Sequence, residues 1–251
     1  MTGKSFAVIV GCVLSASAHA DLIFDATVQL SAQGFGSAPR DLTIQHTGPA
    51  APNDFESGCV GIASGGAFVV GPAGCRTNDA TIDPNGVIPV GGDEPSPLND
   101  SQKYGAPTLA SRGITNAGQI GILFNATEPG GDSINVTDIT LNFFTPTGTF
   151  IGSIDGQQNF PSSFAGNGVA GFVFRVDTAE QALLNALIFS QANFGSILMT
   201  LNSSLTGATG GPDSFAIVNL ASPGVVPEPN GLALLGLAVA VLALAVRSRR
   251  H

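Results

Sequence analysis

The chain has 251 residues and is acidic: the segment 21–226 carries five basic residues against seventeen acidic ones, a net charge of −12. This balance excludes nucleic acid as a partner, because binding a phosphate backbone depends on basic side chains that release counterions. The 33 glycines and the low share of charged residues, 11%, are typical of a secreted, turn-rich β protein rather than a helical one.

The N-terminus has the pattern of a secretory signal peptide. A lysine precedes the apolar stretch 6–14, and Ala18 and Ala20 form the small-x-small pattern of a cleavage site. We therefore predict a signal peptide over 1–20, export by the secretion machinery, and a mature chain that begins at Asp21.

A second interpretation of the N-terminus stays open. The sequence Ile-Val-Gly-Cys that ends at Cys12 has the form of a lipobox, in which the cysteine becomes a lipid-bearing N-terminus. About seven apolar residues separate Lys4 from Cys12, the lower end of the range for a signal peptide. Cleavage before Asp21 is therefore the interpretation that we adopt.

Two cysteines remain after removal of the signal peptide. Cys59 and Cys75 are sixteen positions apart and flank a segment rich in glycine. In an oxidising compartment they predict a disulfide, which would stabilise the fold by roughly 3 kcal/mol. A zinc site would need two further ligands, and the body offers His46 as its one histidine.

The segment 48–113 is dense in Gly, Pro, Asn and Asp, and we predict long loops between short strands such as 67–70. No cofactor is predicted, and surface acidity without a bound ion is the interpretation that we favour. Calcium is the alternative, because oxygen ligands on extracellular loops suit this metal, although their spacing does not match an EF-hand. The five residues concerned are Asp79, Asp83, Asn85, Asp93 and Glu94.

The second half of the chain alternates apolar and polar residues more clearly. The apolar face of 139–143 is shifted by one residue from that of 134–136, which predicts a bulge near 137–138. A turn is predicted at 145–148. Later strands are expected over 172–176, with Phe172, Phe174 and Val176 facing inward, over 197–202 and over 214–220.

One helix is predicted among these strands. Thr178 and Gln181 fit a capping box, and the helix should run for about twelve residues and end near Ser190. Four apolar residues at helical spacing should cover one end of the sheet: Leu183, Leu184, Leu187 and Ile188.

Together these elements predict a mainly β fold. We expect a single antiparallel β-sandwich, jelly-roll-like, with one short helix, over 21–226. A signal helix would precede this body, and a transmembrane helix would follow it.

The body lacks the residue patterns of common active sites, and we predict no catalytic activity. His46 is the one imidazole that could serve a nucleophile, and no glycine doublet has the form of a phosphate-binding loop. Paired carboxylates for glycoside cleavage are conceivable, but nothing in the sequence shows that any two converge. The candidates are Asp93, Glu94, Glu128 and Asp132.

The C-terminal segment 227–251 has three parts. First comes an extended, proline-bounded motif: Pro227, Glu228 and Pro229. The apolar stretch 231–246 follows, about 24 Å long as a helix and a little short of a bilayer core of about 30 Å. A basic end then places the C-terminus on the cytoplasmic side: Arg247, Arg249 and Arg250.

This order of parts is similar to the sorting signal of the PEP-CTERM family. The resemblance covers about 25 of the 251 residues. It implies export in a Gram-negative bacterium, transient anchoring in the inner membrane, and processing near 227–229 by an exosortase, a membrane peptidase. It also implies delivery to the envelope surface or beyond, often in organisms that make exopolysaccharide. A plain C-terminal anchor after a proline-rich hinge is the alternative interpretation.

Two classes of function follow. The first is a structural or adhesive surface protein in an exopolysaccharide or biofilm matrix. The second is a secreted glycan-binding module or hydrolase that uses acidic loops, with or without calcium. Sugar binding has little support, because the chain has no tryptophan and Tyr104 is its one tyrosine. Convergence of 79–94 and 128–132 beside Tyr104 would favour the second class.

Overall fold

Ten strands and four short helical segments make up the part of the chain that the computed structural model describes, residues 21–29, 40–44, 55–70, 106–127, 132–161 and 170–221. The first five strands are β1 (Leu22–Gln29), β2 (Leu42–Ile44), β3 (Glu56–Ile62), β4 (Phe68–Val70) and β5 (Ile120–Ala126). The others are β6 (Ile134–Phe144), β7 (Phe150–Phe160), β8 (Ala170–Val176), β9 (Leu198–Thr206) and β10 (Asp213–Asn219). The helical segments are η2 (Ala117–Gln119), α2 (Thr178–Leu184), η4 (Asn185–Phe189) and η5 (Phe194–Ser196).

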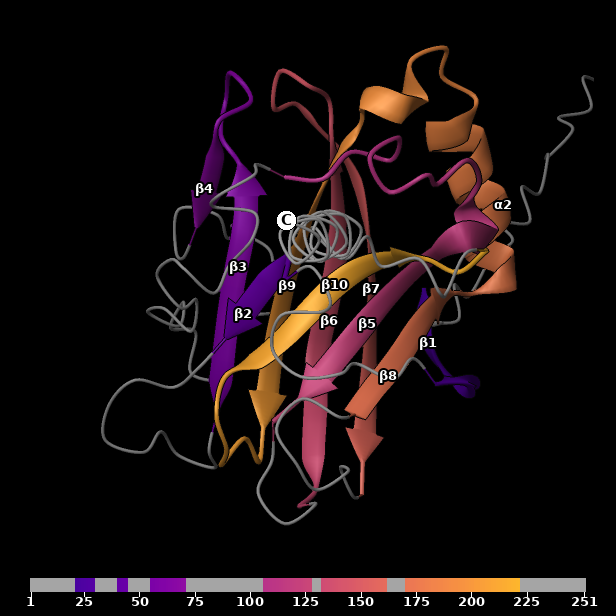
Figure 1. Ribbon diagram of the computed structural model, residues 1–251. Helices are drawn as coiled ribbons and strands as arrows, with labels where there is room; N and C mark the ends of the chain where they lie inside the picture. The colour runs from indigo at the N-terminus through magenta and orange to yellow at the C-terminus, as the bar shows by residue number, and fades with distance from the viewer. Residues whose placement is uncertain are drawn as a thin grey trace, which may run out of the picture.

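The strands form one continuous sheet. Their order is β2-β10-β5-β8-β1-β7-β6-β9-β3-β4. β2, at one end of this order, lies beside β3, close to the other end, so the sheet curls until it is nearly closed like a barrel (Figure 1). A twisted sheet of about ten strands tends to curl in this way, which brings its two edges together.

The predicted mainly β class with one short helix is confirmed, whereas the two-sheet sandwich is not what the strand pairing describes. A sandwich would keep two sheets apart, but here β1 joins β8 on one side to β7 on the other. The physical reason is that this strand is hydrogen-bonded on both sides, so the ladder passes through it without a break.

The arrangement of β1 also corrects the prediction of a purely antiparallel fold. β1 runs antiparallel to β8, with Leu22 opposite Val176, and parallel to β7, with Leu22 opposite Gly156. A Cβ atom at Gly156 would lie 2.3 Å from the carbonyl oxygen of Leu22. Glycine is therefore needed where β1 and β7 meet.

Several local predictions are confirmed. The register of β6 shifts between Val136 and Asp138 against β9, which is the bulge expected at 137–138. The turn at 145–148 is present, with the Gly148 N–H donating to the Thr145 carbonyl at 2.9 Å. Gly148 has φ of +82°, a conformation that favours glycine. Strands at 170–176, 198–206 and 213–219 agree with the expected strands to within a few residues.

β2 is held in place by Asp41, the residue directly before it. The Asp41 N–H donates to the Phe215 carbonyl at 2.9 Å, and the Asp41 carboxylate accepts the Ile217 N–H at 2.7 Å. Arg112 forms an ion pair with the same carboxylate. Because this carboxylate is 3% exposed, breaking the pair would leave a buried charge without its cation. Asp41 therefore fixes one margin of the curled sheet.

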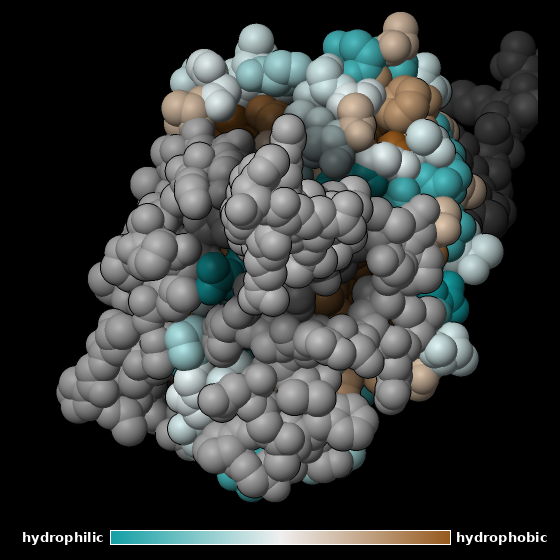
Figure 2. Space-filling view, in the orientation of Figure 1, coloured by the Kyte–Doolittle hydropathy of each residue, from teal (hydrophilic) through white to brown (hydrophobic). Residues whose placement is uncertain are grey.

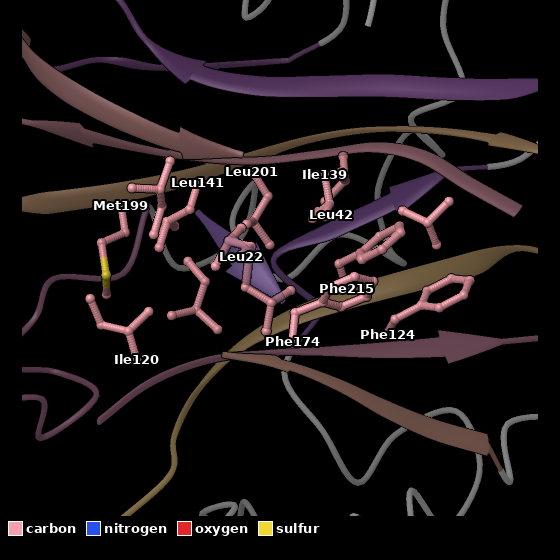
Figure 3. Packing of buried hydrophobic residues seen from close by; sticks show 14 of the residues in the cluster. Leu22, Leu42, Ile120, Phe124, Ile139, Leu141, Phe174, Met199, Leu201 and Phe215 are labelled. Carbon is pink, nitrogen blue, oxygen red and sulfur yellow. The ribbon is translucent and has the colours of Figure 1, made fainter. Parts of the chain in front are cut away.

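Apolar side chains from the strands on either side of β1 meet in the core, with Leu22 between them (Figure 3). Phenylalanine side chains form a cluster at one end of this core. Phe160 and Phe172 stack with ring centroids 4.0 Å apart, and Phe124 and Phe215 stack at 4.6 Å. Phe24 meets Phe160 edge-on at 5.0 Å. The inward orientation predicted for the residues of 172–176 is confirmed, because this strand contributes directly to the cluster.

The other face of β6 and β9 differs from expectation. Alternation predicted apolar residues inward and polar residues toward solvent, yet Asn142, Thr200 and Asn202 are between 0% and 2% exposed. Both faces of these two strands are thus mostly buried. Their neighbour β7 keeps the expected pattern, with Ser153 and Asp155 exposed.

Replacing Phe174 by alanine should lower the free energy of unfolding by about 3–5 kcal/mol, because it removes a fully buried ring from the cluster. Leu183, which is 63% exposed, is the matched control, and its replacement by alanine should change stability by less than about 0.5 kcal/mol. Urea denaturation of both variants measures the difference. Equal losses would show that the cluster is not the core.

Candidate functional site

Most residues predicted to carry function lie outside the described residues. These include the sorting motif, the arginines of the tail, Ala18 and Ala20, Cys75, His46, Tyr104, Glu128 and the five calcium candidates. Of the predicted site residues, the structure places Asp21, Cys59 and Asp132. Asp132 is exposed just before β6. Whether the acidic residues of 79–94 and 128–132 come together beside Tyr104 therefore depends mostly on residues that the structure does not describe.

Cys59 is disulfide-bonded, as the sequence predicted. It lies on β3 opposite Asn202 of β9 and is 1% exposed. Its predicted partner, Cys75, lies outside the described residues. The described half of this cystine therefore lies within a buried strand of the sheet.

Asp21, the predicted first residue of the mature chain, lies at one end of the sheet directly before β1. Its carbonyl accepts the Asp177 N–H at 2.8 Å, which extends the ladder between β1 and β8. Its carboxylate accepts the N–H of Asp155 on β7. The three aspartates therefore meet because β1 is paired on both sides.

Glu180, in the first turn of α2, completes a group of four carboxylates that we call the acidic end: Asp21, Asp155, Asp177 and Glu180. Burial raises the pKa of the Asp21 carboxyl, and the negative charges of Asp155 and Asp177 raise it further, against the hydrogen bond from Asp155. Burial likewise raises the pKa of Glu180, with added repulsion from Asp21 and Asp177. The fold thus holds these groups together against their mutual repulsion.

The helix beside the acidic end is capped differently from the prediction. Asp177, not Thr178, is the N-cap, because its carboxylate accepts the Ala179 N–H at 2.8 Å. Gln181 does not close a capping box, since its amide nitrogen donates to the Val176 carbonyl at 3.0 Å. An aspartate at this position satisfies an N–H that the helix leaves open and also favours the helix dipole.

The apolar stripe of this helix is divided. The helical run covers 178–189 in two parts, α2 and the π-helical turn η4. Leu184 and Ile188 are 4% and 0% exposed, as expected for residues that cover the sheet, whereas Leu183 and Leu187 are 63% and 50% exposed. The prediction that all four face the core is therefore wrong for two of them. The apolar stripe of the helix is wider than the part of its surface that packs against the sheet, so only Leu184 and Ile188 are buried. Figure 2 shows apolar and polar side chains mixed at this end of the molecule.

Backbone groups of η2 fasten the helical run to the sheet. The Ala117 N–H donates to the side-chain oxygen of Asn185 at 2.9 Å, and the Gln119 carbonyl accepts the Leu220 N–H at 2.8 Å. The last residues of β10 therefore leave the body at the same end as α2. The predicted tail begins a few residues farther on.

Chemically, the acidic end offers carboxylates and little else. Within the described ranges, no three His, Cys, Asp or Glu residues are grouped closely enough to hold a metal ion. The pKa shifts of Asp21 and Glu180 are explained by burial and like charge, and they accompany a strand terminus and a helix cap. Perturbed carboxyl groups also occur in structural networks, so these shifts alone do not identify an active site.

The described helices include none that is both long and apolar enough to cross a membrane. The apolar stretch 231–246, on which the predicted span falls, lies outside the described residues. Comparison of the chain with family models, with curated proteins and with solved structures gives no match. The interpretation of the chain therefore rests on its own residues.

Sequence reasoning did not identify the acidic end, although part of its signal was present. The residues at 22, 24, 26 and 28 are apolar and alternate with mostly polar ones, a strand pattern that begins directly after the predicted cleavage site. That pattern could have revealed β1. The approach of Asp155 could not have been found, because it depends on pairing with a strand more than a hundred residues away.

The raised pKa of Glu180 predicts a pH-dependent effect of removing its charge. The contribution of Glu180 to stability is full below its ordinary pKa of 4.5 and is lost as the pH rises through the raised value of the folded state. In a body of residues 18–226, Glu180→Gln should therefore raise the melting temperature at pH 7 and have little effect below pH 4.5. Thermal unfolding across this range measures it.

Asp132→Asn, which removes an exposed carboxylate outside the acidic end, is the control and should show no such pH dependence. In a chain that begins at Asp21, the α-amino group adds a cation beside these carboxylates, so the advantage of Glu180→Gln should shrink. A Glu180→Gln variant that is less stable than the parent at pH 7 would contradict the repulsion.

Proposed function

We propose that this chain is an exported protein of the bacterial envelope surface or extracellular matrix. In this proposal the protein has no catalytic activity of its own, and its role is structural or adhesive in an exopolysaccharide or biofilm layer. The observation that carries the proposal is the three-part C-terminal segment, with its Pro-Glu-Pro motif, its apolar stretch and its arginines in order. This order resembles the PEP-CTERM sorting signal.

The route of the protein follows from its two ends. The secretion machinery exports the chain, and cleavage after Ala20 leaves Asp21 as the first residue. The segment 231–246 then holds the body at the outer side of the inner membrane, with the arginines in the cytoplasm. An exosortase-type peptidase cuts near Pro227, Glu228 and Pro229 and passes the body to the surface.

Features of the body support this proposal. The disulfide of Cys59 suits an oxidising compartment. β1 begins one residue after the proposed cleavage site, so the mature chain retains every residue of the sheet. The sheet is nearly closed and exposes little edge, which limits unwanted strand pairing in a crowded layer.

The alternative of a glycan-binding module or hydrolase has no comparable support. Of its acidic residues, Asp132 alone belongs to the described ranges, where it is exposed. We therefore do not advance it as a second function. A cluster of these carboxylates around a bound sugar or calcium ion would reverse this choice.

Mass spectrometry of the mature protein tests the proposal. After expression of the full-length chain in a bacterium that makes an exosortase, we expect an N-terminus at Asp21 and loss of the residues that follow the Pro-Glu-Pro motif. Replacing Pro227, Glu228 and Pro229 by alanine should leave the tail intact and keep the protein in the membrane fraction.

Pro223→Ala, a proline replacement four residues upstream of the motif, is the matched control and should be processed normally. Recovery of the parent protein from the cell surface with residues 247–251 still attached would refute processing. Equal release of the parent and the alanine variant would refute the role of the motif.

A further inference from the structure

The N-terminal strand of the mature chain occupies an interior place in the sheet. β1 lies between β8 and β7, which are neighbours in sequence but are not paired with each other in the strand order. Without β1, the sheet would part into the halves β2-β10-β5-β8 and β7-β6-β9-β3-β4. The slot between β7 and β8 therefore requires a strand.

We infer that β1 is an exchangeable strand, and that β1 of one molecule fills the slot between β7 and β8 of a second copy of this chain. The structure shows that a segment of this sequence fits the slot, because β1 fills it within one molecule. An identical segment from another copy would make the same hydrogen bonds and contacts. This inference goes beyond the proposed function, but it rests on it for the free N-terminus at Asp21 and for export.

The slot strongly favours an occupant with apolar side chains. Leu22 is fully buried, and Phe24 contacts the phenylalanine cluster at Phe160, Phe172 and Phe174, with centroid distances of 5.0, 6.1 and 6.5 Å. An empty slot would expose these rings and leave two strand edges without hydrogen-bond partners. The slot is therefore expected to be filled, either from its own chain or from another.

The pairing of β1 within its own chain is limited. Four residue pairs join it to β8, one pair joins it to β7, and its register with β8 is interrupted between Phe24 and Gln29. In that interval the Thr27 N–H donates to the carboxylate of Asp25, two residues away, at 2.9 Å. An ion pair of 3.1 Å between Arg175 and Asp25 adds a partly exposed contact. The apolar contacts of Leu22 and Phe24 thus hold β1 firmly, but the stretch of regular strand pairing is short.

Chain connectivity permits the exchange. Cleavage after Ala20 would leave no residue before Asp21, so β1 could leave the slot without pulling another element. Ten residues, 30–39, separate β1 from Arg40. Ten residues can span up to about 35 Å when extended. That length is comparable to the width of a small domain, so β1 could reach a neighbouring molecule.

Export favours the exchange kinetically. β1 leaves the membrane first, yet its partners in the sheet are Gly156 and Val176, which are more than 130 residues later in the chain. Pairing strands over such separations has an entropic cost of loop closure and is slow. A nearby copy whose β7 and β8 are in place, but whose own β1 has not entered the slot, presents both walls of the slot at once. Exchange must still compete with an intramolecular effective concentration on the order of millimolar, so it should increase with crowding at the surface.

A cysteine trap tests this inference, because Ile23 of β1 lies opposite Arg175 of β8. Two full-length chains with different tags, one carrying Ile23→Cys and the other Arg175→Cys, are co-expressed in an exporting host. We expect a disulfide-linked dimer that contains both tags, because the two cysteines come into bonding range only when β1 of one copy occupies the slot of the other.

Two controls accompany the trap. Ile23→Cys paired with Thr147→Cys, an exposed turn position, reports random collision, and the trap should exceed it by at least about tenfold. A single chain carrying both Ile23→Cys and Arg175→Cys reports that the positions are in bonding geometry, and it should close its disulfide internally. Both the trap and the double variant lose the ion pair of Arg175, so they remain comparable.

Each outcome decides the inference. Closure within the double variant, together with a trap yield no higher than the Thr147 control, would show that β1 stays in its own chain and would overturn the inference. Failure of the double variant to form this disulfide either within one chain or between two chains would show that β1 is not seated beside β8, which also overturns it. The intact mass of the same protein reports processing separately, so a failed sorting proposal is distinguishable from failed exchange.

Discussion

The body depends on one insertion: β1 between β7 and β8. The two halves of the sheet share no other strand-to-strand ladder across this position, and their facing apolar side chains meet around Leu22, which is fully buried. Gly156 permits the close approach, because any side chain at this position would collide with the backbone of β1. The curl of the sheet, the packing of Phe24 in the phenylalanine cluster and the position of Asp21, the proposed first residue of the mature chain, all follow from this contact.

The same insertion has an electrostatic consequence. Since β1 is paired on both sides, Asp21 is brought beside Asp155 and Asp177, and the helix that Asp177 caps adds Glu180. Burial and like charges raise the pKa of the Asp21 and Glu180 carboxyl groups and oppose the folded state at neutral pH. Strand pairing and apolar burial outweigh this repulsion. If cleavage creates an α-amino group at Asp21, that group would add a positive charge beside these carboxylates.

The proposed sorting signals and the sheet lie in separate parts of the chain. The proposal for destination rests on a short linear signal at each end, and such signals need no fold to be recognised. The body contributes a nearly closed sheet with a disulfide-bonded cysteine, which suits an extracellular environment. Strand exchange would add to these properties a means by which identical bodies are linked in a layer, without any catalytic residue.

Local patterns in the amino-acid order were enough to locate the bulge at 137–138, the glycine turn at 145–148, the inward face of β8 and the helical run after Val176. Each of these depends on neighbours within a few residues, where periodicity and backbone preference act directly. Folding in three dimensions was required to place β1 at the centre, to pair it in parallel with β7 and to leave Leu187 in solvent. These features depend on which distant strands meet, and pairing across more than a hundred residues leaves no periodic trace in the chain.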